Sequence, residues 1–183
     1  MKIKDILNGK LFYKIFVSWE TFLLMSGLRA CYMYDKDVQE IVQSLPENFR
    51  LGIGIDNASK VMSIEKVGNV FNCQTIKKVN SDYTKGNDLI FKNIRLAQDT
   101  LTARISFLDS YVQSRFVFSG DIESGEKFIK LLDIVQTYMA WPYVRKYVLK
   151  KKLNNPKLIH KIRAFVLFRG MLWEWVIMNF QIM

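Results

Sequence analysis

His160 is the single histidine in this chain of 183 residues, and histidine is the side chain that many enzymes use to move a proton at neutral pH. It lies in a lysine-rich segment, where we interpret it as a surface or packing residue. The chain therefore offers no Ser/His/Asp or Cys/His arrangement independent of His160, and it contains no His-Glu-x-x-His motif. We expect a protein that is not an enzyme.

The two cysteines, Cys31 and Cys73, are 42 residues apart. That separation matches none of the short spacings with which cysteines hold zinc, so we expect no metal site. A reduced pair of thiols is typical of proteins in the cytoplasm, which is the location that we expect for this chain.

Two glycine-containing stretches resemble phosphate-binding loops, and each lacks a required residue. Residues 52–54 (Gly-Ile-Gly) begin like a dinucleotide-binding fingerprint, but Asn57 stands at the third glycine position and a strand is expected next, where the fingerprint needs a helix. Residues 120–127 place Glu126 where a phosphate loop has its lysine, and a carboxylate repels phosphate. We reject both motifs.

The elements that would position any site begin with helices. Residues 10–30 carry an apolar stripe with steps of three and four, which predicts a helix. A shorter helix follows, for which either Asp35 or Asp37 can be the N-cap. Pro46 ends it, because proline cannot continue a helix.

The period then changes to two over residues 49–56, which predicts a strand with one buried face. Further strands are expected at 61–67 and 70–79, and the short turns between them predict an antiparallel meander. A fourth strand is expected at 89–94 and a fifth at 115–119.

Helical spacing returns over residues 95–112, with a break near Ser106. A helix opens at Asp121, whose acidic neighbours favour the positive end of the helix dipole, and Trp141-Pro142 breaks it. A basic amphipathic helix is expected over 143–153. A last helix is expected to start at Pro156.

The order of these elements from Val38 to Met139 resembles that of the sterol carrier protein 2 (SCP-2) domain family. Three short motifs carry the resemblance, and their order and spacing count for more than any one of them. They are the Leu-Pro step leading into a strand at 45–49, the Asp-Leu-Ile-Phe strand at 88–91, and the strand, Gly-Asp and helix at 115–122. The family often has a glycine shortly before its last strand, where this chain has Ser114.

The resemblance implies an α+β fold: a five-stranded, mainly antiparallel sheet covered by helices, with added N-terminal and C-terminal helices. It divides the chain into an N-terminal helical extension (1–36), an SCP-2-like lipid-binding domain (37–140) and a basic and aromatic C-terminal segment (141–183). Family members bind fatty acids, fatty acyl-CoA, phospholipids or sterols in an apolar cavity. We expect a bound lipid to be the one ligand and no other cofactor. The side chains expected to line the cavity are Ile53, Ile55, Phe91, Phe116, Phe118, Phe128, Leu131, Val135 and Trp141.

The positive charge is concentrated in one segment. The chain has a formal net charge of +10, and residues 141–163 contain eight Lys and Arg and no Asp or Glu. Three readings remain open for this segment: contact with an anionic membrane, binding of nucleic-acid phosphates, or a solvated helix face. We favour the membrane over nucleic acid because apolar residues flank the segment. The residues expected to contact the anion are Arg145, Lys146, Lys150, Lys151 and Lys152.

Half of the residues are hydrophobic and 14% are aromatic, which is enough for a core. No stretch reaches the ~18 uncharged apolar residues of a membrane span, so we expect at most a peripheral membrane protein. The predicted function is non-enzymatic binding, or transfer, of a lipid. The alternatives are an accessory interaction or homodimerisation module with a filled core, and, less favoured, a nucleic-acid-binding protein.

Overall fold

The computed structural model describes residues 23–56, 60–68, 70–77, 87–150, 152–153 and 155–171. The first described element is a helix over 23–34, which continues the predicted helix 10–30 beyond its expected end. The rest of that prediction lies outside the described residues.

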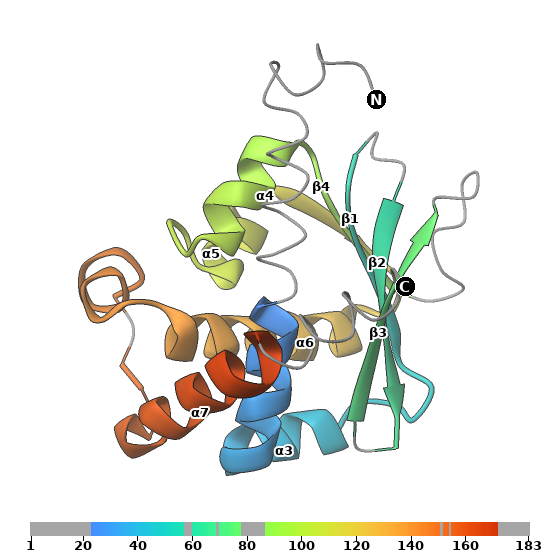
Figure 1. The fold of residues 1–183 in the computed structure, drawn as a ribbon. Helices are drawn as coiled ribbons and strands as arrows, with labels where there is room; N and C mark the ends of the chain where they lie inside the picture. The colour runs from blue at the N-terminus through green and yellow to red at the C-terminus, as the bar shows by residue number, and fades with distance from the viewer. Residues whose placement is uncertain are drawn as a thin grey trace, which may run out of the picture.

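One five-stranded sheet forms the side of the molecule that is at the right in Figure 1. Its spatial order is β3-β2-β1-β4-β5, and β1 pairs in parallel with β4, whereas the other neighbours are antiparallel. The strands are β1 (Arg50–Ile55), β2 (Lys60–Val67), β3 (Val70–Lys77), β4 (Asn87–Phe91) and β5 (Phe116–Ser119).

The helices gather on one side of this sheet, with the long α6 running toward it (Figure 1). Side chains that prefer N-cap positions start four of them: Asp35, Asn93, Ser106 and Asp121 each accept a hydrogen bond from a backbone N–H of the first turn. The α-helices are α3 (Lys36–Gln43), α4 (Ile94–Leu101), α5 (Phe107–Val112), α6 (Ile122–Met139) and α7 (Ile159–Phe165). Two π-helical turns (Val144–Val148 and Val166–Met171) and a 3-10 turn (Pro156–Leu158) complete the described elements.

The predicted fold class is confirmed: the chain is α+β, with a mixed, mostly antiparallel five-stranded sheet packed against helices. The break at Ser106 and the helix start at Asp121 are also where the sequence placed them. The fourth strand ends at Phe91, three residues before its expected end, because Asn93 caps the next helix.

The predicted basic helix over 143–153 is shorter than expected. Helical structure covers residues 142–148, of which Val144–Val148 form a π-helical turn. Lys150 adopts a φ of 52°, and a left-handed backbone at a residue with a Cβ cannot continue a right-handed helix. Lys150 and Lys152 therefore lie outside the helical segment.

Helix α6 lies in direct contact with the sheet at Gly125. A Cβ atom added to Gly125 would lie 2.2 Å from the ring of Phe118 on β5, well inside van der Waals contact. Glycine is therefore required at this close approach of helix and strand.

Aromatic rings fill the space between the sheet and α6. Phe128 of α6 stacks on Phe49 with 5.3 Å between ring centroids, and it meets Phe71 edge to face at 5.8 Å. Phe91 and Phe116 form another edge-to-face pair at 5.3 Å. Such geometries are those preferred by packed rings.

The same hydrophobic core includes the elements at both ends of the described chain. Leu24 and Leu28 of helix 23–34 are buried in it, as are Ile159, Ile162 and Val166 at the C-terminal end. The division into an extension, a domain and a C-terminal segment stays a prediction, but residues from all three ranges share one core.

Candidate functional site

The side chains that the sequence predicted to line an apolar cavity lie, with one exception, in or against the packed core. These are Ile53, Ile55, Phe91, Phe116, Phe118, Phe128, Leu131 and Val135. The exception is Trp141, which is 77% exposed and lines a pocket at the C-terminal end of α6. A ligand site between the sheet and α6 stays a prediction, and the pocket beside Trp141 becomes the better candidate.

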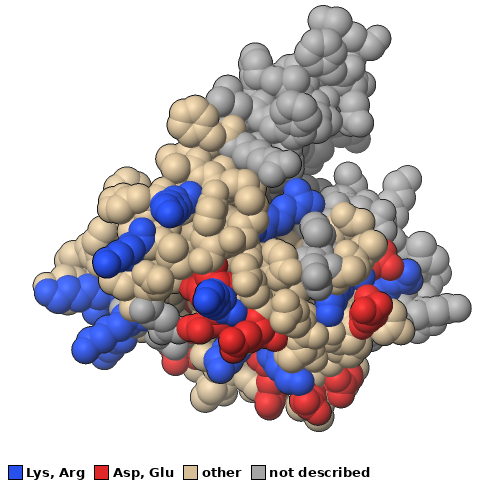
Figure 2. All heavy atoms as spheres, turned by 90° about the horizontal axis from the view of Figure 1, so that it is seen from below, with Lys and Arg blue, Asp and Glu red and all other residues tan. Residues whose placement is uncertain are grey.

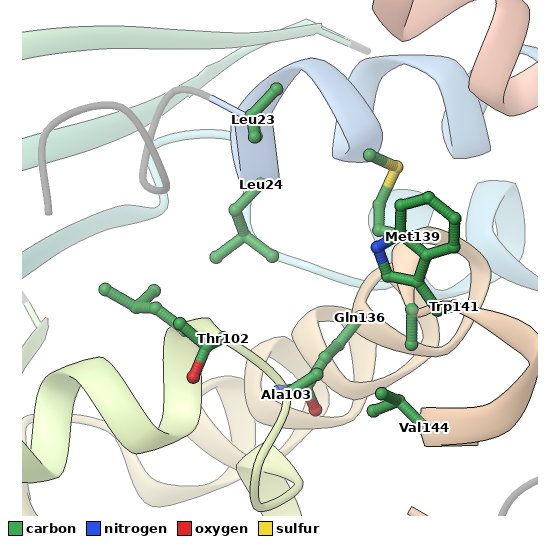
Figure 3. Close-up of a pocket in the computed structure, with 10 residues that line it drawn as sticks. Leu23, Leu24, Thr102, Ala103, Gln136, Met139, Trp141 and Val144 are labelled. Atoms are coloured by element: carbon green, nitrogen blue, oxygen red, sulfur yellow. The ribbon is translucent and has the colours of Figure 1, made fainter. Parts of the chain in front are cut away.

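This pocket has a volume of about 170 Å³. Figure 3 shows Leu24 facing it from helix 23–34, with Met139 and Trp141 on one side and Val144 below. Its walls thus come from four parts of the chain: helix 23–34, the end of α4, the end of α6 and the segment after α6. The lining residues are Leu23, Leu24, Leu101, Thr102, Ala103, Gln136, Met139, Ala140, Trp141 and Val144.

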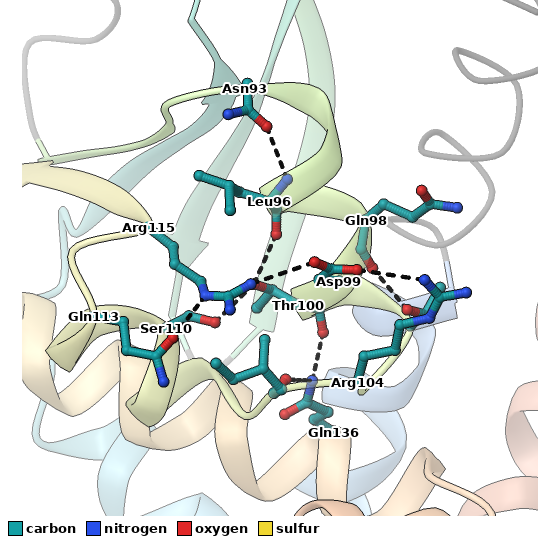
Figure 4. Close-up of polar contacts among 12 residues, drawn as sticks. Asn93, Leu96, Gln98, Asp99, Thr100, Arg104, Ser110, Gln113, Arg115 and Gln136 are labelled. Atoms are coloured by element: carbon teal, nitrogen blue, oxygen red, sulfur yellow. Dashed lines mark hydrogen bonds and ion pairs between the residues drawn. The ribbon is translucent and has the colours of Figure 1, made fainter.

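The two polar residues of the lining already have their hydrogen bonds. The Gln136 amide donates to the carbonyls of Thr100 at 2.5 Å and Ile105 at 3.0 Å (Figure 4). Its oxygen accepts from the Phe107 backbone N–H at 3.3 Å. The Thr102 hydroxyl donates to the Gln98 carbonyl at 2.8 Å. A ligand in this pocket therefore meets mainly apolar surface.

Polar contacts also fix the wall that follows α4. Asp99 accepts hydrogen bonds from Arg104 at 3.5 Å and from Arg115 at 3.4 Å, which ties α4 to the strand-side segment before β5 (Figure 4). The hydroxyls of Thr100 and Ser110 share a buried hydrogen bond of 2.7 Å between α4 and α5. The wall is held in place before any ligand binds.

The other side of the pocket ends at the C-terminus of α6, which Arg163 of α7 holds. Its Nε donates to the Tyr138 carbonyl at 3.0 Å, and its Nη2 donates to the Ala140 carbonyl. A cation at this end of a helix also meets the negative end of the dipole. Burial, and then the positive charge of Arg145, lower the pKa of the Arg163 guanidinium.

A basic and aromatic surface, formed by Trp141, Tyr143, Lys146 and Tyr147, borders the pocket. Trp141 and Tyr143, which is 70% exposed, project from it, and the rings of Tyr143 and Tyr147 lie 4.8 Å apart. Lys146 stands over the Tyr147 ring with its Nζ 4.9 Å from the centroid.

Cations dominate this side of the molecule. In Figure 2, blue side chains project from the left edge, the side on which Figure 1 places the segment after α6, whereas red side chains gather at the centre and lower edge. Of the residues predicted to contact an anion, Lys146, Lys150 and Lys152 are exposed and Arg145 is half-buried. Lys151 lies outside the described residues.

The groups that could carry out chemistry are dispersed. His160 is exposed, and Cys31 is a buried free thiol whose pKa is raised by burial and by the nearby Asp35 charge, so it is a poor nucleophile. Within the described ranges, no cluster of His, Cys, Asp and Glu is suited to a metal ion. The helices described there also lack the length and apolar character needed to cross a membrane.

Most of the lining was not identified from the sequence. Of the lining residues, Trp141 alone was among the side chains that the sequence predicted to line a cavity. Ala103 and Ala140 give no such signal, because a small side chain marks a pocket only when its neighbours in space are known. Arg163 was missed because it contacts backbone carbonyls, which every residue has.

Comparison with known proteins adds one similarity. No family model and no curated protein matches the sequence. Among solved structures, the chain is similar to one described as "UbiJ-SCP2 Ubiquinone synthesis protein", with 13% identity, over 69% of this chain and 96% of that chain, at a TM-score of 0.40. Residues 37–140 have the element order that the resemblance to the SCP-2 family predicts.

Proposed function

We propose that this protein binds the apolar part of a lipid in the pocket at the C-terminal end of α6 and catalyses no reaction. The observation that carries the proposal is the lining, in which the side-chain polar groups of Gln136 and Thr102 are already bonded within the protein. Burial of hydrocarbon is worth about 25 cal/mol per Å² and needs no exact polar constellation. The resemblance to the SCP-2 family supports the same class of ligand.

The size of the pocket limits what it encloses. Its volume of about 170 Å³ is close to that of a ~150 Å³ engineered apolar cavity that binds benzene. A ring or one end of an acyl chain fits such a space, and the rest of the ligand lies over the rim. The exposed ring of Trp141 gives that part an apolar surface.

We also propose that the basic and aromatic surface contacts an anionic membrane, from which the lipid is taken up. Each cation near such a surface contributes about 1 kcal/mol, and Trp and Tyr rings favour the headgroup level. Trp141 supports this proposal because it is exposed on this surface and also lines the pocket. A lipid then passes from the membrane into the pocket without crossing water.

A second candidate is an interaction module in which the apolar surface meets another protein or a second copy. The observation in its favour is the ring packing between α6 and the sheet, where the sequence had predicted a cavity. In that case the pocket would not take up lipid.

Displacement of a fluorescent fatty acid tests lipid binding. Val144→Trp and Met139→Trp, each at a lining position, should fill the pocket and lower the affinity by about tenfold or more. The matched control is Val148→Trp, an exposed position on the same π-helical turn, which should bind like the unaltered protein. Equal binding by all variants, with their folds intact by circular dichroism, would place any ligand elsewhere. Failure of the unaltered protein to bind the probe would favour the interaction module.

Flotation with liposomes tests membrane contact. The protein should float with vesicles of phosphatidylcholine and phosphatidylserine and remain behind with phosphatidylcholine alone. Replacing the exposed Lys146, Lys150 and Lys152 by Glu should abolish flotation. The control changes the same charge at exposed lysines elsewhere, Lys36, Lys92 and Lys130. An equal loss in both triple variants would mean that net charge alone, and no particular surface, attracts the protein.

A further inference from the structure

A second group of contacts beside the pocket involves Arg145 and Arg163. Arg163 uses Nε and Nη2 to hold the carbonyls of Tyr138 and Ala140, and Ala140 also lines the pocket. Arg145 is on the π-helical turn that starts with the lining residue Val144. Both arginines therefore adjoin residues that line the pocket at the end of α6.

The Nη1 atom of Arg145 is buried, and no atom of the described residues accepts a hydrogen bond from it. A guanidinium group has five N–H donors and no way to lose its charge at neutral pH. Leaving one of its donors buried without an acceptor is costly. This position calls for an acceptor that the described part of the protein does not supply.

The sequence on either side of both arginines also lacks negative charge. Residues 141–163 contain no Asp or Glu, and the ion pairs of the described residues are formed by other cations: Arg50, Arg104, Arg115 and Lys127. The charge of Arg145 contributes, after burial, to the lowered pKa of Arg163, as expected for two cations that lie near each other. An anion between them would relieve both effects.

We propose that Arg145 and Arg163 form an oxyanion site, which holds the phosphate or carboxylate group of the lipid whose apolar part occupies the neighbouring pocket. The planar donors of arginine suit such groups, and hydrogen bonds between two charged partners are stronger than neutral ones. Arg163 keeps its orientation through the two carbonyls, while Arg145 supplies the buried donor.

This inference rests on the proposed function for the apolar tail and deepens it by naming the class of ligand. In an anionic amphiphile, the apolar tail contacts the pocket lining and the charged group accepts hydrogen bonds from the arginines. A sterol, which has only a hydroxyl group, leaves the Arg145 donor without a charged partner. The site therefore selects fatty acids or lipid phosphates over neutral lipids.

Isothermal titration calorimetry with three probes tests the assignment: decyl phosphate, decanol and inorganic phosphate. Decyl phosphate should bind the full chain about tenfold or more tightly than decanol, which has the same tail without the charge. Arg145→Gln should remove this difference, so that decyl phosphate binds no more tightly than decanol. Arg95→Gln is the matched control, because it makes the same substitution at an exposed residue of α4 outside the basic segment, and it should keep the difference.

A second variant at position 145 distinguishes the effect of the planar guanidinium donors from the effect of positive charge alone. Arg145→Lys retains the charge and loses the planar donor set, so it should bind decyl phosphate with an affinity between those of the unaltered protein and Arg145→Gln. Arg163 is left in place, because its replacement also releases the end of α6. Equal affinity of the unaltered protein for decyl phosphate and decanol would overturn the site, as would equal losses in Arg145→Gln and Arg95→Gln.

The three probes also tell the two proposals apart. If decanol binds and decyl phosphate gains nothing from its charge, the pocket stands and the oxyanion site fails. If decanol does not bind but inorganic phosphate binds and Arg145→Gln abolishes that binding, the arginines hold an oxyanion and the lipid function fails. If none of the probes binds, both proposals fail.

Discussion

The hydroxyl of Tyr138 donates a hydrogen bond of 2.5 Å to the carboxylate of Asp35, across 103 residues of sequence. Both side chains are buried, with 1% and 4% of their surface exposed. The other carboxylate oxygen accepts the backbone N–H of Asp37 at 2.9 Å and so caps α3. One carboxylate therefore joins the start of α3 to the last turn of α6, next to the pocket.

Replacing Tyr138 by Phe should lower the free energy of unfolding by about 1–3 kcal/mol, because a buried carboxylate loses a donor. Urea titration followed by circular dichroism measures the change. Tyr143→Phe, at an exposed position, is the control and should stay within about 0.5 kcal/mol of the unaltered protein. Equal effects of the two changes would mean that the Tyr138 hydroxyl contributes nothing.

The hydrogen bond between Tyr138 and Asp35 also makes the free energy of unfolding depend on pH in the alkaline range. Burial, followed by the hydrogen bond and the charge of Asp35, raises the pKa of Tyr138 above its ordinary value of about 10. The unfolded chain then loses this proton at a lower pH than the folded one. The stabilising contribution is therefore complete below about pH 10 and is lost as the pH rises above it. Between about pH 10 and 11, the free energy of unfolding of Tyr138→Phe should fall less steeply than that of the unaltered protein, and parallel curves would contradict this.

Gly125→Ala tests the contact between α6 and β5. Inside a helix, alanine is ordinarily more stable than glycine by roughly 0.5–1 kcal/mol. Here the added Cβ meets the Phe118 ring, so we expect a loss of about 1–3 kcal/mol. Glu126→Ala, exposed on the same helix, is the control for helix propensity. A more stable Gly125→Ala protein would mean that the helix stands away from the sheet, with room for the cavity that the sequence predicted.

Ser114→Gly should have the opposite effect and stabilise the protein by roughly 0.5–1 kcal/mol. Ser114 has a φ of 51°, a left-handed conformation that disfavours any residue with a Cβ, and it precedes β5 at a place where SCP-2 domains often have glycine. The control is Ser44→Gly, where φ is −74°: glycine there adds freedom to the unfolded chain and removes the hydrogen bond from Ser44 Oγ to the Ile41 carbonyl. Thermal unfolding of both variants should move the midpoint in opposite directions.

Local signals were sufficient for most of the elements. The break at Ser106 and the cap at Asp121 depend on neighbouring residues, and the structure has both. The alternation over 49–56 correctly predicted a strand, but the expectation of one buried face was wrong, because residues 51–54 of this central strand are all buried. The parallel pairing of Ile53 with Leu89 was not predicted. The two residues are far apart in sequence, and neither strand contains a local pattern that identifies its partner. The end of the basic helix was missed for a related reason: a lysine in a left-handed conformation looks like any other lysine in the sequence.

The candidate site was harder to predict than the fold. Apolar residues such as Phe128 and Leu131 were identified correctly as interior, but whether interior residues fill or enclose space depends on distances between elements. The pocket depends on how helix 23–34 and Val144 meet the end of α6, and those contacts are remote in sequence. Arg145 was predicted as an anion contact from charge alone, and the burial of its Nη1 atom gives that prediction a specific location.

The packing of α7 into the common core has a consequence for any attempt to prepare a minimal fragment. Ile159, Ile162 and Val166 are buried beside α6, and Arg163 holds the carbonyls at its end. A chain cut after residue 140 would expose the apolar side chains of α6 that pack against α7, and the two carbonyls would lose their Arg163 donors. Such a fragment should be prone to aggregate, so binding measurements belong on the intact polypeptide.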